Sequence, residues 1–170
     1  MNTIKIKFIL EDGREMKADL YPDLAPISVE NFVNLIKDKY FDGLIFHRVI
    51  KGFMIQGGGM TLDMNEKGGL QEIKGEFSIN GWNKNAMELS HVPGVLSMAR
   101  TNVPDSATSQ FFIVTGDAKF LDGQYASFGK LSDQASLDVA LAIENVETTS
   151  KGFHDDVPVE PIIIKTVELI

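Results

Sequence analysis

The sequence predicts a mostly β domain, built as a sandwich or a barrel, and three observations support this fold class. Fifteen glycines divide the 170-residue chain into short apolar runs, spaced roughly eight to twelve residues apart as in all-β domains. The first twenty residues alternate apolar and polar side chains, as half-buried strands do. Hydrophobic residues make up 44% of the chain and charged residues 24%, which is typical of a globular protein. We expect one domain over residues 1–170.

The N-terminal segment predicts a β-hairpin. Alternation places one set of side chains on one face of each strand, and Asp12-Gly13 between the two strands favours a tight turn because glycine tolerates positive φ. The apolar positions are Ile4, Ile6, Phe8 and Leu10 before the turn, and Met16, Ala18 and Leu20 after it.

Two segments have the apolar spacing of helices. The first follows Pro26, with Ser28 as the expected N-cap, and its apolar stripe comprises Val29, Phe32, Val33 and Ile36. The second is expected over Gln134–Asn145, with Asp133 or Ser132 as the cap. Its core-facing residues are Leu137, Ala140 and Leu141, with Ile143 or Ala142 beside them.

The remaining short apolar runs predict further strands. They cover residues 44–50, 53–56, 95–100, 111–115, 125–129 and 162–169. Residues 61–91 are less regular and richer in Gly, Asn and Lys, so we expect mostly long loops there. Long loops in a compact domain are often functional.

Composition excludes several classes of site. The chain has no cysteine, so disulfides, thiolate zinc sites and cysteine nucleophiles are absent. Its formal charge of −8 and pI near 4.8 argue against binding nucleic acid or an anionic membrane. It contains neither an apolar stretch of spanning length nor the N-terminal pattern of a signal peptide, so a cytoplasmic protein is the expectation. The histidines (His47, His91 and His154) lack metal-ligand spacing, so no metal is expected.

Residues 46–59 hold the most informative pattern. Arg48 shares one face of its predicted strand with Phe46 and Ile50. If the chain turns back after the strand, Arg48, Phe53 and Gln56 surround one shallow apolar pocket with a few polar groups, the usual form of a small-ligand site. The alternatives are that Arg48 bridges to a carboxylate or simply lies at the rim of the sheet, and that Phe53 and Met54 only pack in the core. The run Gly57-Gly58-Gly59 lacks the Gly-Lys-Ser/Thr of a phosphate loop and instead favours close backbone approach.

Together with two later segments, this block resembles the cyclophilin family of peptidyl-prolyl isomerases, and its bacterial members in particular. The matching residues are Asp12-Gly13, Ala25-Pro26, Glu30-Asn31-Phe32, Tyr40–Gly43, Phe46–Gly59, Gly94–Arg100, Ser109–Thr115 and Leu121-Asp122-Gly123. The likeness to bacterial members lies in Met98–Thr101, together with Ser106-Ala107 and Ser109-Gln110. The resemblance spans nearly the whole chain. It implies a closed eight-stranded antiparallel β-barrel capped by two α-helices, which would leave no exposed sheet edge.

The resemblance also implies roles for individual residues. Arg48 matches the catalytic arginine, and His47 matches a neighbour on the opposite face of the strand. The residues that match the proline-ring site are Phe53, Met54, Phe112 and Leu121. Those that match contacts to the substrate main chain, or support for the arginine, are Gln56, Gln110, Ala99 and Arg100. Phe120 and Tyr125 replace the tryptophan and histidine of many eukaryotic members, so cyclosporin is expected to bind more weakly.

The implied activity is cis-trans isomerisation of X-Pro bonds in proline-containing peptides and in unfolded or folding proteins, without a cofactor. A peptide-binding module with little turnover is the alternative, whereas a hydrolase or a nucleotide-binding domain has no supporting motif. A monomer is expected. Residues 101–108 and 74–78 are expected to border the pocket for residues upstream of proline, with Arg100, Thr101 and Glu76 tuning it.

Overall fold

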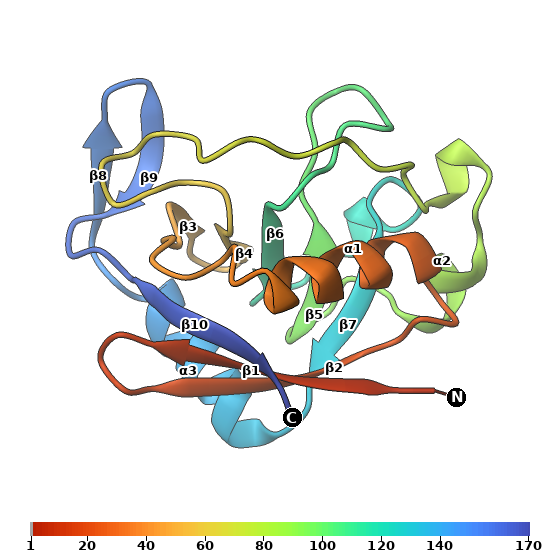
Figure 1. The fold of residues 1–170 in the computed structure, drawn as a ribbon, viewed down its shortest axis with the longest axis horizontal. Coiled ribbons are helices and arrows are strands. Elements are labelled where there is room, and N and C mark those ends of the chain that lie inside the picture. The colour runs from red at the N-terminus through yellow and green to blue at the C-terminus, as the bar shows by residue number, and fades with distance from the viewer. Residues whose placement is uncertain (1) are drawn as a thin grey trace.

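The computed structural model describes residues 2–170 and shows a curled β-sheet with helices on two sides (Figure 1). The strands are β1 (Ile4–Leu10), β2 (Glu15–Leu20), β3 (Arg48–Ile50), β4 (Met54–Gly57), β5 (Val95–Met98), β6 (Phe111–Val114), β7 (Ser127–Leu131), β8 (Thr148–Lys151), β9 (His154–Pro158) and β10 (Ile164–Leu169). The α-helices are α1 (Pro26–Lys37), α2 (Lys84–Glu88) and α3 (Gln134–Glu144), and the 3₁₀ turns are η1 (Ser78–Asn80) and η2 (Lys119–Leu121).

Eight of the strands form one antiparallel sheet, as predicted. Their order is β10-β1-β2-β7-β5-β6-β4-β3. β1 and β2 form the expected hairpin, with Phe8 opposite Met16 and Gly13 at a φ of 93° in the turn. The other six strands begin and end within a few residues of the predicted ranges.

The two end strands of the sheet meet through a short contact rather than a ladder. Ile45, which precedes β3, forms an isolated bridge with Ile163, which precedes β10. Beside it, the amide of Phe46 donates to the carbonyl of Ile162 at 3.0 Å, and the amide of Ile164 donates to that of Leu44 at 2.8 Å. The prediction of a closed barrel is therefore wrong in this detail: the eight strands form a half-barrel that is open between β3 and β10, where only irregular backbone contacts join its two ends.

Aromatic rings fill the interior of the curl. Phe111 on β6 is fully buried, and its ring centroid lies 5.4 Å from Phe8 and from Phe32, 5.7 Å from Phe41 and 5.8 Å from Phe46. Such ring pairs add to the hydrophobic free energy of their burial. Phe32 reaches this cluster from α1, so the predicted apolar stripe of that helix faces the core.

A second, smaller apolar cluster lies on the outer face of β4, β5 and β6. Strand alternation produces it: Phe111 and Ile113 belong to the interior cluster, whereas Phe112 and Val114 belong to the outer one. Similarly, Ile55 points inward and Met54 outward. The loop after β6, with η2, covers part of this outer cluster through Ala118 and Leu121.

The two predicted helices are present, and on α3 Ala140, Ile143 and Leu137 face the core as predicted, whereas Leu141 lies outside the core clusters and Ala142 is exposed. Asp133 caps α3, since its Oδ1 accepts from the amide of Ser136 at 2.8 Å. The prediction that Ser28 caps the first helix is wrong, because α1 begins at Pro26 with Ala25 in the cap position. Ser28 is buried instead and donates from its amide and its hydroxyl to Glu76 at 2.7 and 2.8 Å. The short helix α2 was not expected.

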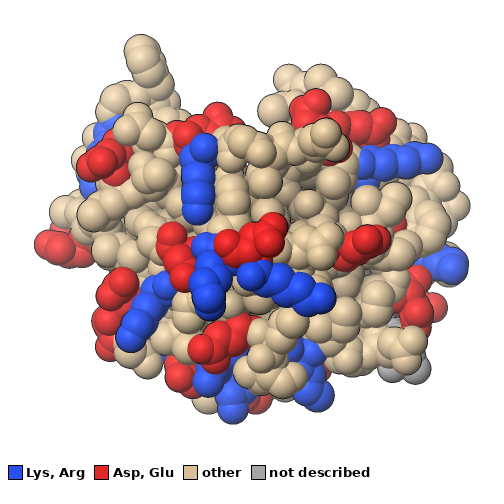
Figure 2. Space-filling model, in the orientation of Figure 1, with Lys and Arg blue, Asp and Glu red and all other residues tan. Residues whose placement is uncertain are grey.

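Three further features concern the surface. The β8–β9 hairpin forms a separate two-stranded sheet that was not predicted, and it lies beside β3. On the face shown in Figure 2, basic and acidic side chains are interspersed. No helix within residues 2–170 is long and apolar enough to cross a membrane.

Candidate active site

A pocket of about 130 Å³ opens over the outer apolar cluster. Strand alternation and the β3–β4 turn bring its residues together from four separate segments. The lining consists of Arg48, Phe53, Met54, Gln56, Ala99, Arg100, Phe112, Leu121 and Tyr125. Nine of the eleven residues assigned to the site from the sequence therefore line one cavity.

Arg48 stands exposed at the rim of this pocket on β3. The chain turns back as predicted, so Arg48 pairs with Gln56 across the β3–β4 ladder. Its Nη1 donates to Oε1 of Gln56 at 3.2 Å, and Nε2 of Gln56 donates to Oε1 of Gln110 at 2.9 Å. The ion pairs of residues 2–170 do not include Arg48. Two amides thus orient the guanidinium without neutralising its charge, and the carboxylate-bridge alternative does not hold.

Four apolar side chains form the body of the pocket. Met54 and Phe112 come from the neighbouring strands β4 and β6, and 1% and 4% of their surface remains exposed. Phe53 comes from the β3–β4 turn, and Leu121 from η2. They enclose a space for a compact apolar group, with the arginine at its edge.

Three large side chains lie at the edge of the pocket, namely Phe120, Tyr125 and Arg100. Phe120 is 65% exposed and lies outside the lining, where its ring stacks on Phe53 with centroids 5.6 Å apart. Tyr125 meets the edge of Phe112 at 5.8 Å. Arg100 places its guanidinium 4.7 Å from the Tyr125 ring, an arrangement that favours both groups electrostatically.

The predicted close approach at the triple glycine is confirmed. A Cβ on Gly57 would lie 2.7 Å from the carbonyl oxygen of Ile45, and one on Gly59 would collide with the side chain of Gln110. The absence of side chains here lets Gln110 reach Gln56, so these glycines shape the polar side of the pocket.

A buried polar network beneath the pocket was not anticipated. The ring of His91 is 1% exposed and stacks on Phe112 with centroids 5.9 Å apart. Its Nδ1 lies 2.8 Å from Oδ1 of Asp122, and its Nε2 lies 2.8 Å from Oγ of Ser97. An ionised Asp122 can only accept, so Nδ1 carries the proton and Ser97 donates to Nε2. The network supports the Phe112 ring on its buried side. Because Asp122 directly follows Leu121, the same network also holds the main chain next to that pocket residue.

This Ser–His–Asp sequence is not a hydrolytic triad. Ser97 is fully buried and faces Phe112 in the β5–β6 ladder, so no substrate carbonyl reaches its hydroxyl. Burial lowers the pKa of His91, although Asp122 partly opposes the shift. Burial alone would raise the pKa of Asp122, but hydrogen bonds from Ser90 and His91 lower it overall.

His47 lies on the opposite strand face from Arg48, as expected. It is 6% exposed, and its Nδ1 has no hydrogen-bond partner. Burial, together with the nearby His154 and Arg48, lowers the pKa of His47 to about 4. A neutral, buried imidazole on the far side of the strand contributes nothing to the pocket surface. Within residues 2–170, no three His, Cys, Asp or Glu side chains converge as metal ligands.

A second hollow of about 150 Å³ adjoins the pocket. It shares Gln56, Ala99 and Arg100 with the first, and its own residues are Glu66, Thr101, Ser106, Thr108 and Gln110. Loop 101–108 borders it through Thr101, Ser106 and Thr108, whereas the segment 74–78 is not part of its lining. Within that segment, the carboxylate of Glu76 is buried against α1. Glu66, from the irregular region 61–91, had no sequence signal.

The fold and the pocket together indicate what kind of ligand the site can hold. An arginine oriented at the rim of an apolar pocket suits a ligand that combines a compact apolar group with a hydrogen-bond acceptor, as a proline residue within a peptide does. The family model for cyclophilin-type peptidyl-prolyl cis-trans isomerases matches residues 5–169. The chain belongs to this family.

Individual relatives agree with the family assignment. A peptidyl-prolyl cis-trans isomerase of Acinetobacter baylyi is 45% identical over 91% of this chain and 79% of its own length. Peptidyl-prolyl cis-trans isomerase B of Escherichia coli is 41% identical over 86% of this chain and 88% of its own. A cyclophilin-type isomerase of Cryptosporidium parvum, solved in the presence of the dipeptide Ala-Pro, has a TM-score of 0.75 at 29% identity, covering 98% of each chain. The protein is thus a peptidyl-prolyl cis-trans isomerase.

Proposed function

We propose that the pocket lined by Phe53, Met54, Phe112 and Leu121 holds the proline ring of the substrate and that Arg48 is the catalytic residue. The observation that carries this proposal is the position of the Arg48 guanidinium, which the Gln56–Gln110 amide pair orients at the rim of an apolar cavity. The Ala-Pro dipeptide present with the Cryptosporidium parvum structure supports a proline-containing ligand.

The barrier to rotation about a peptide bond comes from amide resonance and is about 18–20 kcal/mol. When the bond before proline twists, resonance is lost and the prolyl nitrogen regains a lone pair. A guanidinium N–H directed at this nitrogen bonds to the twisted form more strongly than to either planar form, which is the differential binding that accelerates a reaction. Because a guanidinium offers several fixed donors, no covalent step or cofactor is needed.

Besides the apolar pocket, the main chain after β5 binds the substrate peptide. The amide of Ala99 already donates to the carbonyl of Gln110 at 3.0 Å, so the main chain at Arg100 is the part left for the substrate. With the ring held in the pocket and one flank held at Arg100, rotation is confined to the carbonyl that precedes proline. Restricting the reacting groups in this way lowers the entropic part of the barrier.

The clients proposed are proline-containing segments of unfolded or folding proteins, bound by a monomer. The pocket supports this proposal, because it opens to the surface and has room for about one compact ring, which suits a short extended segment. The competing hypothesis, a binding module without turnover, is disfavoured because an oriented arginine adds little to ring binding but contributes directly to rotation.

Cis-trans exchange in a short Ala-Pro peptide tests this function directly. We expect NMR exchange spectroscopy to show faster interconversion with catalytic amounts of protein, against an uncatalysed exchange that takes tens to hundreds of seconds. Peptide resonances that shift on binding without faster exchange would establish the binding module instead.

Cyclosporin is expected to inhibit the protein weakly, and Phe120→Trp to strengthen inhibition. Phe120 is exposed beside Phe53, where an indole could donate an N–H that phenylalanine lacks. Inhibition of Ala-Pro peptide exchange, titrated with cyclosporin for both proteins, measures the effect. Nanomolar inhibition of the unchanged protein would contradict the expectation.

A further inference from the structure

The second hollow carries one charge on the side away from the proline pocket. Of the five residues that line only this hollow, Glu66 is the charged one, and the others are Thr101, Ser106, Thr108 and Gln110. Glu66 is exposed, and the ion pairs formed within residues 2–170 do not include it. Its carboxylate therefore faces the hollow without a basic partner.

Nearby basic side chains are held elsewhere. Lys67 follows Glu66 but donates from Nζ to the carbonyl of Tyr40 at 2.7 Å, and its ammonium lies 4.3 Å from the centroid of that ring. Arg100 lines the hollow on the shared side. Its guanidinium donates to the carbonyl of Gln124 at 2.7 and 3.1 Å, and to its neighbour's carbonyl at 2.9 Å. It also lies over the rings of Phe77 and Tyr125. These bonds keep both cations away from Glu66.

The neutral groups around the hollow are largely committed too. The hydroxyl of Ser106 donates to the carbonyl of Val103 at 2.7 Å and accepts from the amide and hydroxyl of Thr101. The carbonyl of Thr108 accepts from Nδ2 of Asn31 at 2.7 Å, and Oε1 of Gln110 accepts from Gln56. The uncommitted strong acceptor is thus Glu66.

We propose that this hollow receives a lysine or arginine side chain from the client, at the second residue before proline, and that Glu66 pairs with it. An extended peptide alternates its side chains, so this residue and proline point to the same face. Since the two cavities share Gln56, Ala99 and Arg100, one chain can fill both. The inference rests on the proposed function, because it takes the proline pocket as the anchor.

The expected preference is modest because Glu66 is exposed. An exposed ion pair supports a gain of about two- to fivefold in kcat/KM. Screening by salt should reduce this gain at ionic strengths of about 1 M, where the Debye length is near 3 Å. A preference based on the shape of the hollow would not depend on salt.

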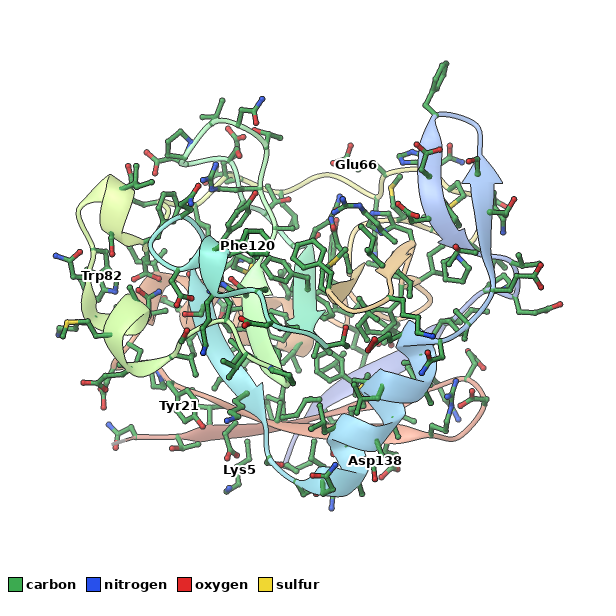
Figure 3. All side chains as sticks on the ribbon, turned by 180° about the vertical axis from the view of Figure 1, so that it is seen from behind. Lys5, Tyr21, Glu66, Trp82, Phe120 and Asp138 are labelled. Atoms are coloured by element: carbon green, nitrogen blue, oxygen red, sulfur yellow. The ribbon has the colours of Figure 1, made fainter. Side chains whose placement is uncertain are left out.

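Exchange rates of Xaa-Ala-Pro peptides test the proposal, with Xaa as Lys, Ala or Glu. In the unchanged protein we expect Lys to exceed Ala by about two- to fivefold and Glu to be slowest. Glu66→Gln should make Lys and Ala equal, and Glu66→Lys should favour Glu. Asp138→Asn on α3 is the matched control, because it removes the same charge far from the hollow (Figure 3) and should keep the preference for Lys.

The outcomes separate this inference from the proposed function. A Lys preference that survives Glu66→Gln, or that appears at the residue immediately before or at the second residue after proline, would overturn the role of Glu66. If no peptide exchanges faster, the proposed function fails. The same peptides can then be titrated by chemical shift, and equal affinities of the Lys and Ala peptides would overturn the inference as well.

Discussion

Arg48→Ala should lower kcat/KM for an Ala-Pro peptide by about 10²–10³-fold, the loss seen when a single transition-state donor is removed. The Arg48 guanidinium is oriented at the rim of the pocket, whereas the guanidinium of Arg100 is bound to main-chain carbonyls, and the neutral Gln56–Gln110 pair cannot replace a charged donor. Arg48→Lys should recover little activity because a mobile ammonium lacks the fixed fork of donors. NMR exchange at several peptide concentrations measures both variants.

The fold should survive this substitution. Arg48 is exposed and forms no ion pair within residues 2–170, and exposed positions of this kind usually change the free energy of unfolding by less than about 0.5 kcal/mol. Urea unfolding provides the control. An Arg48→Ala protein that kept both its stability and its full exchange rate would show that ring binding alone drives isomerisation.

The pocket could be predicted from the sequence wherever strand alternation determines it. In the run 111–114 a period of two sends Phe111 inward and Phe112 outward, and a tight return after β3 brings Phe53 and Gln56 to Arg48. Nothing beyond local geometry and pairing is needed for these contacts. The role of each residue, however, came from the family resemblance and not from the pattern.

Other features depend on contacts between distant segments that have no local signal. Ser28 has the sequence position of a helix cap, but Glu76, 48 residues away, binds its amide and hydroxyl and buries both residues. The His91–Asp122 contact likewise joins two turns that are 31 residues apart. Glu66 lies in an aperiodic loop, so its position at the second hollow follows only from the path of the chain.

The β8–β9 hairpin was missed for a different reason. Its first strand, Thr148–Lys151, contains no apolar residue and buries no side chain, so the alternation of half-buried strands is absent. The hairpin is held by its own ladder and by contact with β3. Backbone pairing of this kind leaves no hydrophobic pattern in the sequence.

Phe111→Ala should destabilise the protein by about 3–5 kcal/mol, the range for deleting a buried aromatic ring. Phe111 is fully buried, and four other phenylalanine rings lie within 6 Å of its centroid. The substitution would leave a cavity surrounded by rings from β1, α1 and the segment before β3. These rings cannot all move into it, so relaxation of the surroundings would recover little of the lost packing. Urea unfolding measures the change, and Phe111→Leu gives a smaller loss that remains measurable if the alanine variant does not fold.

Phe53→Ala should reduce activity more than stability, in contrast to Phe111→Ala. Phe53 is half-buried at the rim of the pocket and belongs to the outer cluster, so its removal should cost less stability than the loss of Phe111. The proposed contact between this ring and proline would be removed, so we expect kcat/KM to fall about tenfold, which corresponds to about 1.4 kcal/mol of transition-state binding. Equal losses of stability in the two variants would show that the outer cluster is part of the structural core. In that case a substitution in the pocket would also destabilise the fold that supports it.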